Sequence, residues 1–355
     1  MKVSIIGVTG YSGLELLRLL LLHPQVEVVS LHRSTKEVEE IDDLYPHLRH
    51  LTDLKVEPAD PEKIMKKADL VFFATSSGIA KDLADPFIQA DFPVIDLSGD
   101  HRLTTEAYRE WYKKDPAKAE NLKQAHYGLA EFADPKVGNY LLDPAANAHK
   151  ANLIANPGCY ATTTMLGLAP LVQKDLIEMD SIIVDAKSGL SGAGKKLSNA
   201  SHYVEAHDNM SMYKLNHHQH IPEIVQQLHA WNENVHHIQF STSLIPVTRG
   251  IFASIYAKVK KGATPEQLNE AYTNVYHDKY FVRVHPYGTL PQIKNVVGSN
   301  FCDLGLDYNP ETGFVTVVSV IDNLVKGAAG QAIQNLNLWA GWPEQTGLEL
   351  APLFP

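Results

Sequence analysis

Short apolar runs alternate with helix-like stretches through the first half of the chain. The runs lie at residues 2–6, 26–31, 70–74 and 94–97. Each run has apolar residues at both odd and even positions, so both faces of the corresponding strand would be buried, which is typical of a parallel sheet covered by helices. The leucine-rich stretch 14–22 fits one such helix, and Pro24 would end it. The pattern predicts an N-terminal α/β domain.

The pattern changes beyond Ile154. The strand-like segments are longer there and partly alternating, at residues 182–184, 239–246, 251–259 and 314–321. Loops rich in glycine, histidine and asparagine separate them, which favours a mixed or antiparallel sheet in an α+β domain. The last helix is expected to begin near Asp322 and to run through Leu336. The chain therefore divides into two domains of different architecture.

Composition narrows the function classes. The chain has 355 residues and a net charge of −10, with only 2 cysteines. An acidic balance disfavours binding to nucleic acid phosphates, and no apolar run reaches the roughly 18–20 residues that span a membrane. Two cysteines cannot form a disulfide framework, so the thiols are expected to be reduced. We therefore expect a cytoplasmic protein that binds neither nucleic acid nor a membrane.

A glycine-rich turn follows the first apolar run and opens a helix. A diphosphate binds well at such a turn, because the free N–H groups and the dipole of the helix point at it and glycines allow close approach. The spacing G-x-x-G-x-x-G differs from the usual dinucleotide fingerprint, and a purely structural turn is the alternative. The predicted cofactor-binding residues are Gly7, Thr9, Gly10, Tyr11, Ser12 and Gly13.

The end of the second apolar run indicates the type of dinucleotide. An acidic residue there would favour NAD, but the sequence from Leu31 to Thr35 has none. Arg33 with Ser34 or Thr35 could instead hold a 2′-phosphate, which favours NADP. The alternative is a solvated surface arginine.

Cys159 follows the turn Asn156-Pro157-Gly158 and precedes a helical stretch. At a helix N-terminus the dipole stabilises a thiolate, and the same N–H groups could hold an oxyanion on a carbonyl bonded to sulfur. The alternative is an inert buried cysteine, which is how we interpret Cys302.

A histidine cluster, His217 to His220, precedes Pro222, a residue that suits the first turn of a helix. His218 and His220 are therefore expected in a loop just before that helix. An imidazole there could exchange a proton with sulfur or with a tetrahedral oxygen. The alternatives are a metal site, for which no H-E-x-x-H motif is present, and a solvated loop without a role.

Three further loops could bind anions. Arg102 follows the fourth apolar run and could hold a phosphate or a carboxylate, although an ion pair with a neighbouring aspartate is the alternative. The loop from Ser188 to Lys196, with Ser191 and Gly192, could lie against a planar ring or an anion, or be a flexible surface loop. Arg249, at the end of a strand, is a candidate for a substrate carboxylate.

These motifs, in this order, resemble those of the N-acetyl-gamma-glutamyl-phosphate reductases, the NADPH-dependent enzymes of arginine biosynthesis. The motifs that carry the resemblance are residues 7–13, 154–162 with 167–170, 190–194, 218–224 and 322–332. The chain departs from the family at Thr163, where Gly or Ala is usual. Where the family often has His-Arg-His, this chain has His218-Gln219-His220. Where the family often has Asp-Phe-Arg, this chain has Asp100-His101-Arg102.

The resemblance implies a Rossmann-type dinucleotide-binding domain over 1–153, completed by a C-terminal helix in 322–355. It implies an α+β catalytic and oligomerisation domain over 154–321, of the glyceraldehyde-3-phosphate and aspartate-semialdehyde dehydrogenase type, in a homodimer or homotetramer. Cys159 would be the nucleophile, and His220, or alternatively His218, the acid/base. Asn323 would lie near the nicotinamide and Arg102 near the substrate phosphate.

The predicted reaction is reduction of N-acetyl-glutamyl phosphate by NADPH through a thioester on Cys159. The nearest alternative is the same chemistry on aspartyl phosphate or on a carrier-bound aminoadipyl phosphate. A cysteine hydrolase or acyltransferase, in which the glycine turn is structural, would not bind NADPH. A dinucleotide sensor would bind NADPH but would form no thioester.

Overall fold

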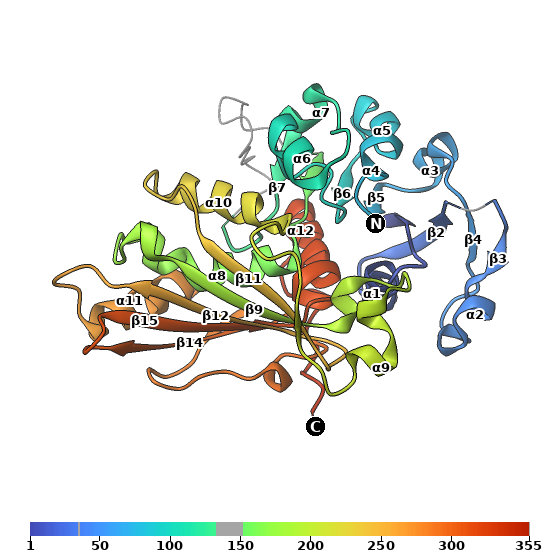
Figure 1. The fold of residues 1–355 in the computed structure, drawn as a ribbon. Helices are drawn as coiled ribbons and strands as arrows, with labels where there is room; N and C mark the ends of the chain where they lie inside the picture. Colours follow the sequence, from blue (N-terminus) through green and yellow to red (C-terminus); the bar gives the residue numbers. More distant parts are fainter. Residues whose placement is uncertain (35, 133–151, 355) are drawn as a thin grey trace. The chain divides into compact units, whose positions relative to one another are not determined.

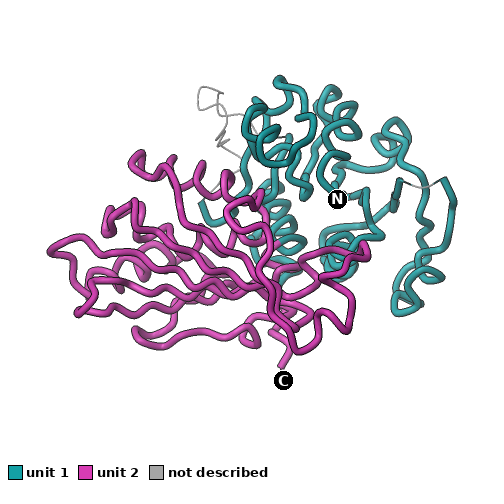
Figure 2. Tube along the Cα trace, in the orientation of Figure 1, with its two compact units in different colours: residues 1–157, 328–348 teal, residues 158–327, 349–355 magenta. Residues whose placement is uncertain are grey.

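The computed structural model describes residues 1–34, 36–132 and 152–354. The chain forms two compact units, one of residues 1–157 with 328–348 and one of residues 158–327 with 349–355 (Figure 2). These boundaries differ by a few residues from the expected division at 153 and 321. The last residues belong to the second unit instead of the first, where the Leu353 N–H donates to the Val297 oxygen at 2.8 Å.

The first unit contains an eight-stranded sheet in the order β3-β4-β2-β1-β5-β6-β8-β7. All four predicted apolar runs form parallel strands in it, and only the short edge strand β3 is antiparallel. The strands are β1 (Lys2–Ile6), β2 (Glu27–Arg33), β3 (Glu39–Glu40), β4 (Lys55–Pro58), β5 (Leu70–Phe73), β6 (Val94–Asp96), β7 (Ala125–Tyr127) and β8 (Leu153–Ala155).

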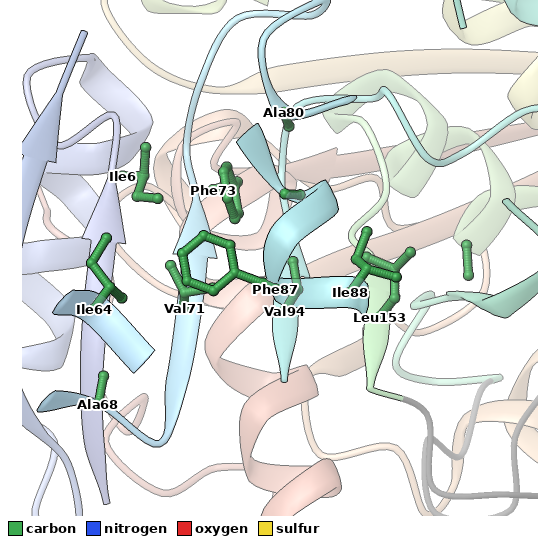
Figure 3. Close-up of a cluster of buried hydrophobic side chains, with 12 residues drawn as sticks. Ile6, Ile64, Ala68, Val71, Phe73, Ala80, Phe87, Ile88, Val94 and Leu153 are labelled. Carbon is green, nitrogen blue, oxygen red and sulfur yellow. The ribbon is translucent and has the colours of Figure 1, made fainter. Parts of the chain in front are cut away.

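Helices cover this sheet and bury its apolar runs. Phe73 of β5 meets Phe87 edge to face with ring centroids 5.8 Å apart, in a cluster that also contains Ile6, Ile64 and Val94 (Figure 3). The helices are α1 (Tyr11–Leu20), α2 (Ile41–Leu44), α3 (Pro61–Lys67), α4 (Ala80–Leu83), α5 (Asp85–Gln89), α6 (Thr105–Tyr112), α7 (Ala119–Gln124) and α12 (Gly330–Ala340). The continuous apolar runs are thus explained by burial on both faces.

The strand order creates a switch point at β1. The chain passes from β1 to β2 on one side, and later to β5 on the other side. In open α/β sheets, ligands bind outside the carboxyl ends of the strands at such a point. The residues that follow β1 and β5 are therefore placed to bind a ligand.

The C-terminal helix α12 belongs to the first unit, where Asn335 Nδ2 donates to the Gly128 oxygen at 2.8 Å. It begins at Gly330, later than the Asp322 start that we expected, and a π-helical turn, Val325–Ala329, precedes it. The Asp322 side chain accepts hydrogen bonds from the N–H groups of Leu324 and Val325, at 2.8 and 3.1 Å, as the side chain of an N-cap does, so the π-helical turn extends the helical segment back towards the expected start.

The second unit contains a mixed seven-stranded sheet in the order β10-β11-β9-β12-β15-β14-β13. β9 pairs parallel with β11 and antiparallel with β12, so the predicted mixed sheet is confirmed. The strands are β9 (Ile183–Gly189), β10 (Ser211–Met212), β11 (Gln239–Ile245), β12 (Ile251–Lys258), β13 (Val282–Val284), β14 (Cys302–Asn309) and β15 (Phe314–Ile321).

One buried helix, α8 (Cys159–Gln173), lies across β12 and β15 (Figure 1). Every residue from Tyr160 to Val172 is buried, because α10 (His220–Trp231) and α11 (Pro265–Tyr276) also pack against this helix. The remaining helix, α9 (Tyr203–Ala206), is one turn long. The packing around α8 fixes the position of Cys159 at its start.

Candidate active site

The glycine turn after β1 has the conformation that its sequence predicted. Gly7 has a φ of +92°, and a Cβ there would lie 2.5 Å from the Ala74 oxygen. A Cβ on Gly13 would lie 2.3 Å from the Gly7 oxygen. At Gly10, by contrast, the nearest atom would be 3.6 Å away. Gly7 and Gly13 therefore serve the turn itself, whereas Gly10 leaves space in front of the helix.

The start of α1 can accept an anion. Gly10 is the N-cap of the helix, and no side chain caps it. The first-turn N–H groups, including those of Tyr11 and Ser12, have no acceptor within the helix. Thr9 is held by its oxygen, which accepts a hydrogen bond from Tyr45 Oη at 2.8 Å. The turn thus presents uncapped donors and the positive end of a helix dipole.

The loop that follows β5 borders the same turn, and the sequence analysis missed it. A Cβ on Gly7 would lie 3.1 Å from Thr75 Cγ2. The Thr75 hydroxyl is buried and has no hydrogen-bond partner among the described residues, so it could bond a ligand. Only the order of the strands in the sheet brings β5 beside β1, so no local motif marks this residue. The turn, the helix start and Thr75 together fit a dinucleotide diphosphate.

Arg33 lies at the end of β2, as predicted, but its guanidinium is already paired. Nη2 forms an ion pair with Glu39 and donates to the Glu37 oxygen at 3.1 Å. A 2′-phosphate would have to share this guanidinium with Glu39. Ser34 follows Arg33 directly, and Thr35 lies outside the described residues.

Arg102 is buried on a braced loop. Its Nε donates to the Asn156 oxygen at 2.7 Å and its Nη2 donates to the Leu97 oxygen at 2.8 Å. Nearby, Asp96 Oδ2 lies 2.7 Å from His101 Nδ1, with both side chains fully buried. Burial would raise the pKa of Asp96, but the hydrogen bond and the charge of His101 outweigh it and hold this pKa below its usual value. These contacts give Arg102 a bracing role.

Cys159 is the first residue of α8, as predicted, and Gly158 is its N-cap. A Cβ on Gly158 would lie 2.3 Å from His220 Nε2, so the imidazole rests against the turn before the cysteine. A Cβ on Gly327 would lie 2.7 Å from the Cys159 Cβ. Two glycines therefore allow the histidine ring and the segment after β15 to approach the cysteine closely.

Glu223 anchors this turn and was not predicted. The carboxylate is fully buried, and its Oε1 accepts the Gly158 N–H at 2.8 Å. Glu223 lies three residues after His220, so both side chains project from the same face at the start of α10. A glutamate in a first helical turn can be predicted from the local sequence to stabilise N–H groups. Only the fold shows that Glu223 binds the N–H of Gly158.

The two candidate histidines differ in their surroundings. His220 is the first residue of α10, which corrects its expected place in a loop, because the helix begins two residues before Pro222. His218 stays in the loop, and its Nδ1 accepts the His220 N–H at 3.2 Å. Its ring packs edge to face on the rings of Tyr160 and Tyr213, with centroid distances of 5.2 and 5.7 Å.

Burial has a direct consequence for His218. Its side chain is 3 % exposed, and desolvation first, with the charge of His220 second, lowers the pKa of His218 to about 2. An imidazole that stays neutral across the physiological range cannot supply a proton. The Nδ1 of His218 instead holds the backbone N–H of His220 at the start of α10, and the low pKa of His218 favours His220 as the acid/base.

Ser191, Gly192 and Asn323 come together in the second unit. Asn323 Nδ2 donates to Ser191 Oγ at 3.0 Å, and Asn323 Oδ1 accepts the Gly250 N–H at 2.7 Å. A Cβ on Gly192 would lie 2.7 Å from Ser188 Oγ. The amide of Asn323 thus ties the small-residue loop after β9 to the loop before β12.

Arg249 lies in that second loop, not at the end of a strand, because β11 stops at Ile245. Its Nε is 3.0 Å from Asp322 Oδ2, and the Asp322 carboxylate is fully buried. Asp322 also accepts the Gly298 N–H at 2.7 Å. The ion pair fixes the segment that carries Asn323, which favours a bracing role for Arg249.

The described residues contain neither a metal-binding cluster nor a membrane-spanning helix. No group of three or more His, Cys, Asp or Glu side chains in ranges 1–34, 36–132 and 152–354 is arranged to hold a metal ion. No helix in these ranges is both long enough and apolar enough to cross a bilayer.

Comparison with known proteins gives the family. Residues 2–140 match the NAD binding domain of semialdehyde dehydrogenases, and residues 159–323 match the semialdehyde dehydrogenase dimerisation domain. The N-acetyl-gamma-glutamyl-phosphate reductase of Streptococcus gordonii is 55% identical over 354 residues, covering 100% of both chains. The chain belongs to the N-acetyl-gamma-glutamyl-phosphate reductase family. The reductase of Listeria innocua is 53% identical over 356 residues, again with 100% coverage of both chains.

Solved structures confirm the predicted fold class of this reductase family member. Aspartate semialdehyde dehydrogenase II of Vibrio cholerae has a TM-score of 0.69 at 16% identity, covering 96% of this chain and 98% of that one. The aspartate semialdehyde dehydrogenase of Candida albicans, solved with NADP, has a TM-score of 0.67 at 18% identity, covering 96% and 97%. At this identity the likeness shows the fold alone.

Proposed function

We propose that this chain reduces N-acetyl-L-glutamyl 5-phosphate to N-acetyl-L-glutamate 5-semialdehyde and phosphate, with NADPH as reductant, in arginine biosynthesis. The observation that carries the proposal is the environment of Cys159. The residue begins a buried helix, its N-cap touches the ring of His220, and Glu223 holds the turn. The family of the chain and its match to an NAD binding domain support the choice of substrate and cofactor.

The turn after β1 would hold the dinucleotide diphosphate. Gly10 gives it room, the uncapped start of α1 donates N–H groups, and Thr75 offers a hydroxyl without a partner among the described residues. When bound, NADPH supplies hydride. Ser34 and Arg33 would lie near the 2′-phosphate. Asn323 with Ser191 and Gly192 would lie near the nicotinamide.

Cys159 acts as the nucleophile. The dipole of α8 stabilises its thiolate, which attacks the acyl carbon. The bond from that carbon to the phosphate oxygen breaks, phosphate leaves, and a thioester to Cys159 remains. First-turn N–H groups of α8, such as that of Tyr160, stabilise the oxyanion that develops on the same carbon. After reduction, the tetrahedral oxyanion collapses to the aldehyde and releases the thiolate.

His220 handles the proton of the reaction. The overall conversion consumes one proton, which the departing phosphate carries away, and an imidazole beside the nucleophile can supply it. His218 stays neutral and fixes His220 through the hydrogen bond from the His220 N–H. Arg102 and Arg249 shape the surrounding loops, and the proposal does not require either to touch the substrate.

A dimerisation domain over residues 159–323 supports an oligomer, and we propose a homodimer or homotetramer. A biosynthetic enzyme of this kind works in the cytoplasm, which is also our proposal for this chain.

The deciding experiment replaces the nucleophile. Cys159→Ser should lower turnover with N-acetyl-glutamyl phosphate by at least about a thousandfold, because a hydroxyl has no comparable anion near neutral pH. NADPH binding, followed by its fluorescence, should be retained. Cys302→Ser is the matched control, since Cys302 is buried with its Sγ 3.6 Å from Ser319 Oγ.

Mass spectrometry of the intact protein mixed with acyl phosphate, without reductant, should show an acyl adduct on Cys159. Near-normal turnover of Cys159→Ser would rule out covalent catalysis. In the reverse reaction, with phosphate and NADP, aspartate semialdehyde should be a poor substrate. If it were preferred, the assigned substrate would be wrong.

A further inference from the structure

Thr163 lies one turn into α8 and is fully buried. Its Oγ1 donates a hydrogen bond to the Cys159 oxygen at 2.8 Å. Through this hydrogen bond Thr163 reaches the backbone of the proposed nucleophile directly.

The hydroxyl acts on a single peptide unit. The Cys159 carbonyl and the Tyr160 N–H belong to the same peptide group, so a donor to the carbonyl polarises the N–H and makes it a stronger donor. The Tyr160 N–H is one of the first-turn groups without an intrahelical acceptor. A hydrogen bond to the Cys159 oxygen therefore makes the Tyr160 N–H, at the other end of the same peptide, a stronger donor to an oxyanion.

The same residue is also tied to the sheet. Ser319 Oγ, on β15 and fully buried, donates to the Thr163 oxygen at 2.8 Å. This bond fixes the backbone of Thr163 against β15. The Thr163 hydroxyl in turn fixes the backbone of Cys159. The first turn of α8 is thus held from the sheet below it and by Glu223 at Gly158.

We propose that the Thr163 hydroxyl is a positioning group for catalysis: it orients and polarises the Cys159–Tyr160 peptide so that the Tyr160 N–H stabilises the thiolate and the oxyanion formed on the acyl carbon. The inference rests on the proposed function of Cys159. It assigns to Thr163 a role through the peptide, without contact with substrate or cofactor.

The test uses variants that match in shape and burial. Thr163→Val removes the hydroxyl but keeps the β-branched shape, and Thr163→Ser keeps the hydroxyl. Thr164→Val is the control, because Thr164 is the next residue of the same helix, is fully buried, and its hydroxyl has no hydrogen-bond partner among the described residues. Unfolding temperatures identify any variant that simply fails to fold.

Two measurements separate positioning from mere structure. Alkylation of Cys159 by iodoacetamide, followed by mass spectrometry as a function of pH, should shift to higher pH in Thr163→Val and return in Thr163→Ser. The kcat of Thr163→Val should fall roughly three- to tenfold, the factor that corresponds to one neutral hydrogen bond, with KM unchanged. Thr164→Val should match the wild type in both measurements.

Two results would overturn the inference. One is a Thr163→Val variant with wild-type alkylation and kcat. The other is a loss that Thr164→Val shares or that Thr163→Ser fails to restore. An unreactive wild-type Cys159, or a wild type without activity on the acyl phosphate, would instead refute the proposed function itself.

Discussion

Two strand-to-helix turns of this protein, those before α1 and α8, begin helices in the same local way but have different surroundings. α1 and α8 both start after a glycine N-cap in extended conformation, Gly10 with φ −83° and Gly158 with φ −75°, and neither has a side-chain cap. At α1 a Cβ on Gly10 would meet only ordinary contacts, the nearest at 3.6 Å. At α8 the same space is filled by the ring of His220.

Any helix N-terminus can stabilise an anion, and the residues packed around it determine which anion it binds. An open N-terminus suits a phosphate that comes and goes. An N-terminus packed between His220 and Gly327 suits the thiolate that we propose, because the helix dipole acts on the sulfur and the imidazole lies against the turn before it. The predictions below test whether each turn depends on the feature that distinguishes it.

The largest effect is expected at the open turn. Gly7→Ala places a side chain at φ +92° and 2.5 Å from the Ala74 oxygen. The backbone conformation alone costs about 1–2 kcal/mol, and the steric overlap adds to it. We expect a lower unfolding temperature, measured by calorimetry, together with loss of NADPH binding.

Gly10→Ala separates ligand binding from stability at the same turn, because its Cβ would lie 3.6 Å from the nearest protein atom. Its unfolding temperature should stay close to that of the wild type while NADPH affinity falls, since only the ligand needs this space. Equal destabilisation by both alanines would contradict the distinction between a glycine that serves the turn and one that serves the ligand.

At the packed turn, Gly158→Ala should act on chemistry and not on cofactor binding. Its φ of −75° suits alanine, but the new Cβ would lie 2.3 Å from His220 Nε2 and displace the ring. A shift of about 1 Å in a catalytic group can lower turnover on the order of a hundredfold. Steady-state kinetics and NADPH fluorescence give the two readouts.

A double variant checks the cause. If the loss in Gly158→Ala comes from His220, then adding His220→Ala should cause little further loss, because the two changes remove one function. Additive losses would mean that Gly158 acts independently of the histidine.

The smallest effect concerns acid stability of the second unit. The pKa of His218 is about 2 in the folded protein, compared with 6.5 for an ordinary histidine. Above pH 6.5 both states are neutral, and below it only the unfolded state takes up the proton, so stability falls as pH falls. His218 alone should remove about 2 kcal/mol between pH 6.5 and 5.

Urea unfolding of His218→Asn at several pH values checks this. The amide oxygen can still accept the His220 N–H but does not titrate, so the variant should lose less stability on acidification than the wild type. An unchanged dependence on pH would mean that His218 is protonated in the folded protein.

The sequence alone determined the elements that depend on local patterns. Continuous apolar runs gave buried parallel strands, and glycine spacing after β1 gave the turn that opens α1. The position of Cys159 at the start of a helix also followed from the Pro157-Gly158 turn before it. These features depend on neighbouring residues, whose periodicity and backbone preferences are visible in the sequence.

Only the tertiary structure decided which residues act on these turns. Thr75 reaches Gly7 through the strand order, Glu223 binds the Gly158 N–H, and burial lowers the pKa of His218, which is why we propose His220 as the acid/base. Arg33 and Arg249 looked available for ligands, but each has a carboxylate partner. Burial and long-range pairing set these properties, and no local spacing encodes them.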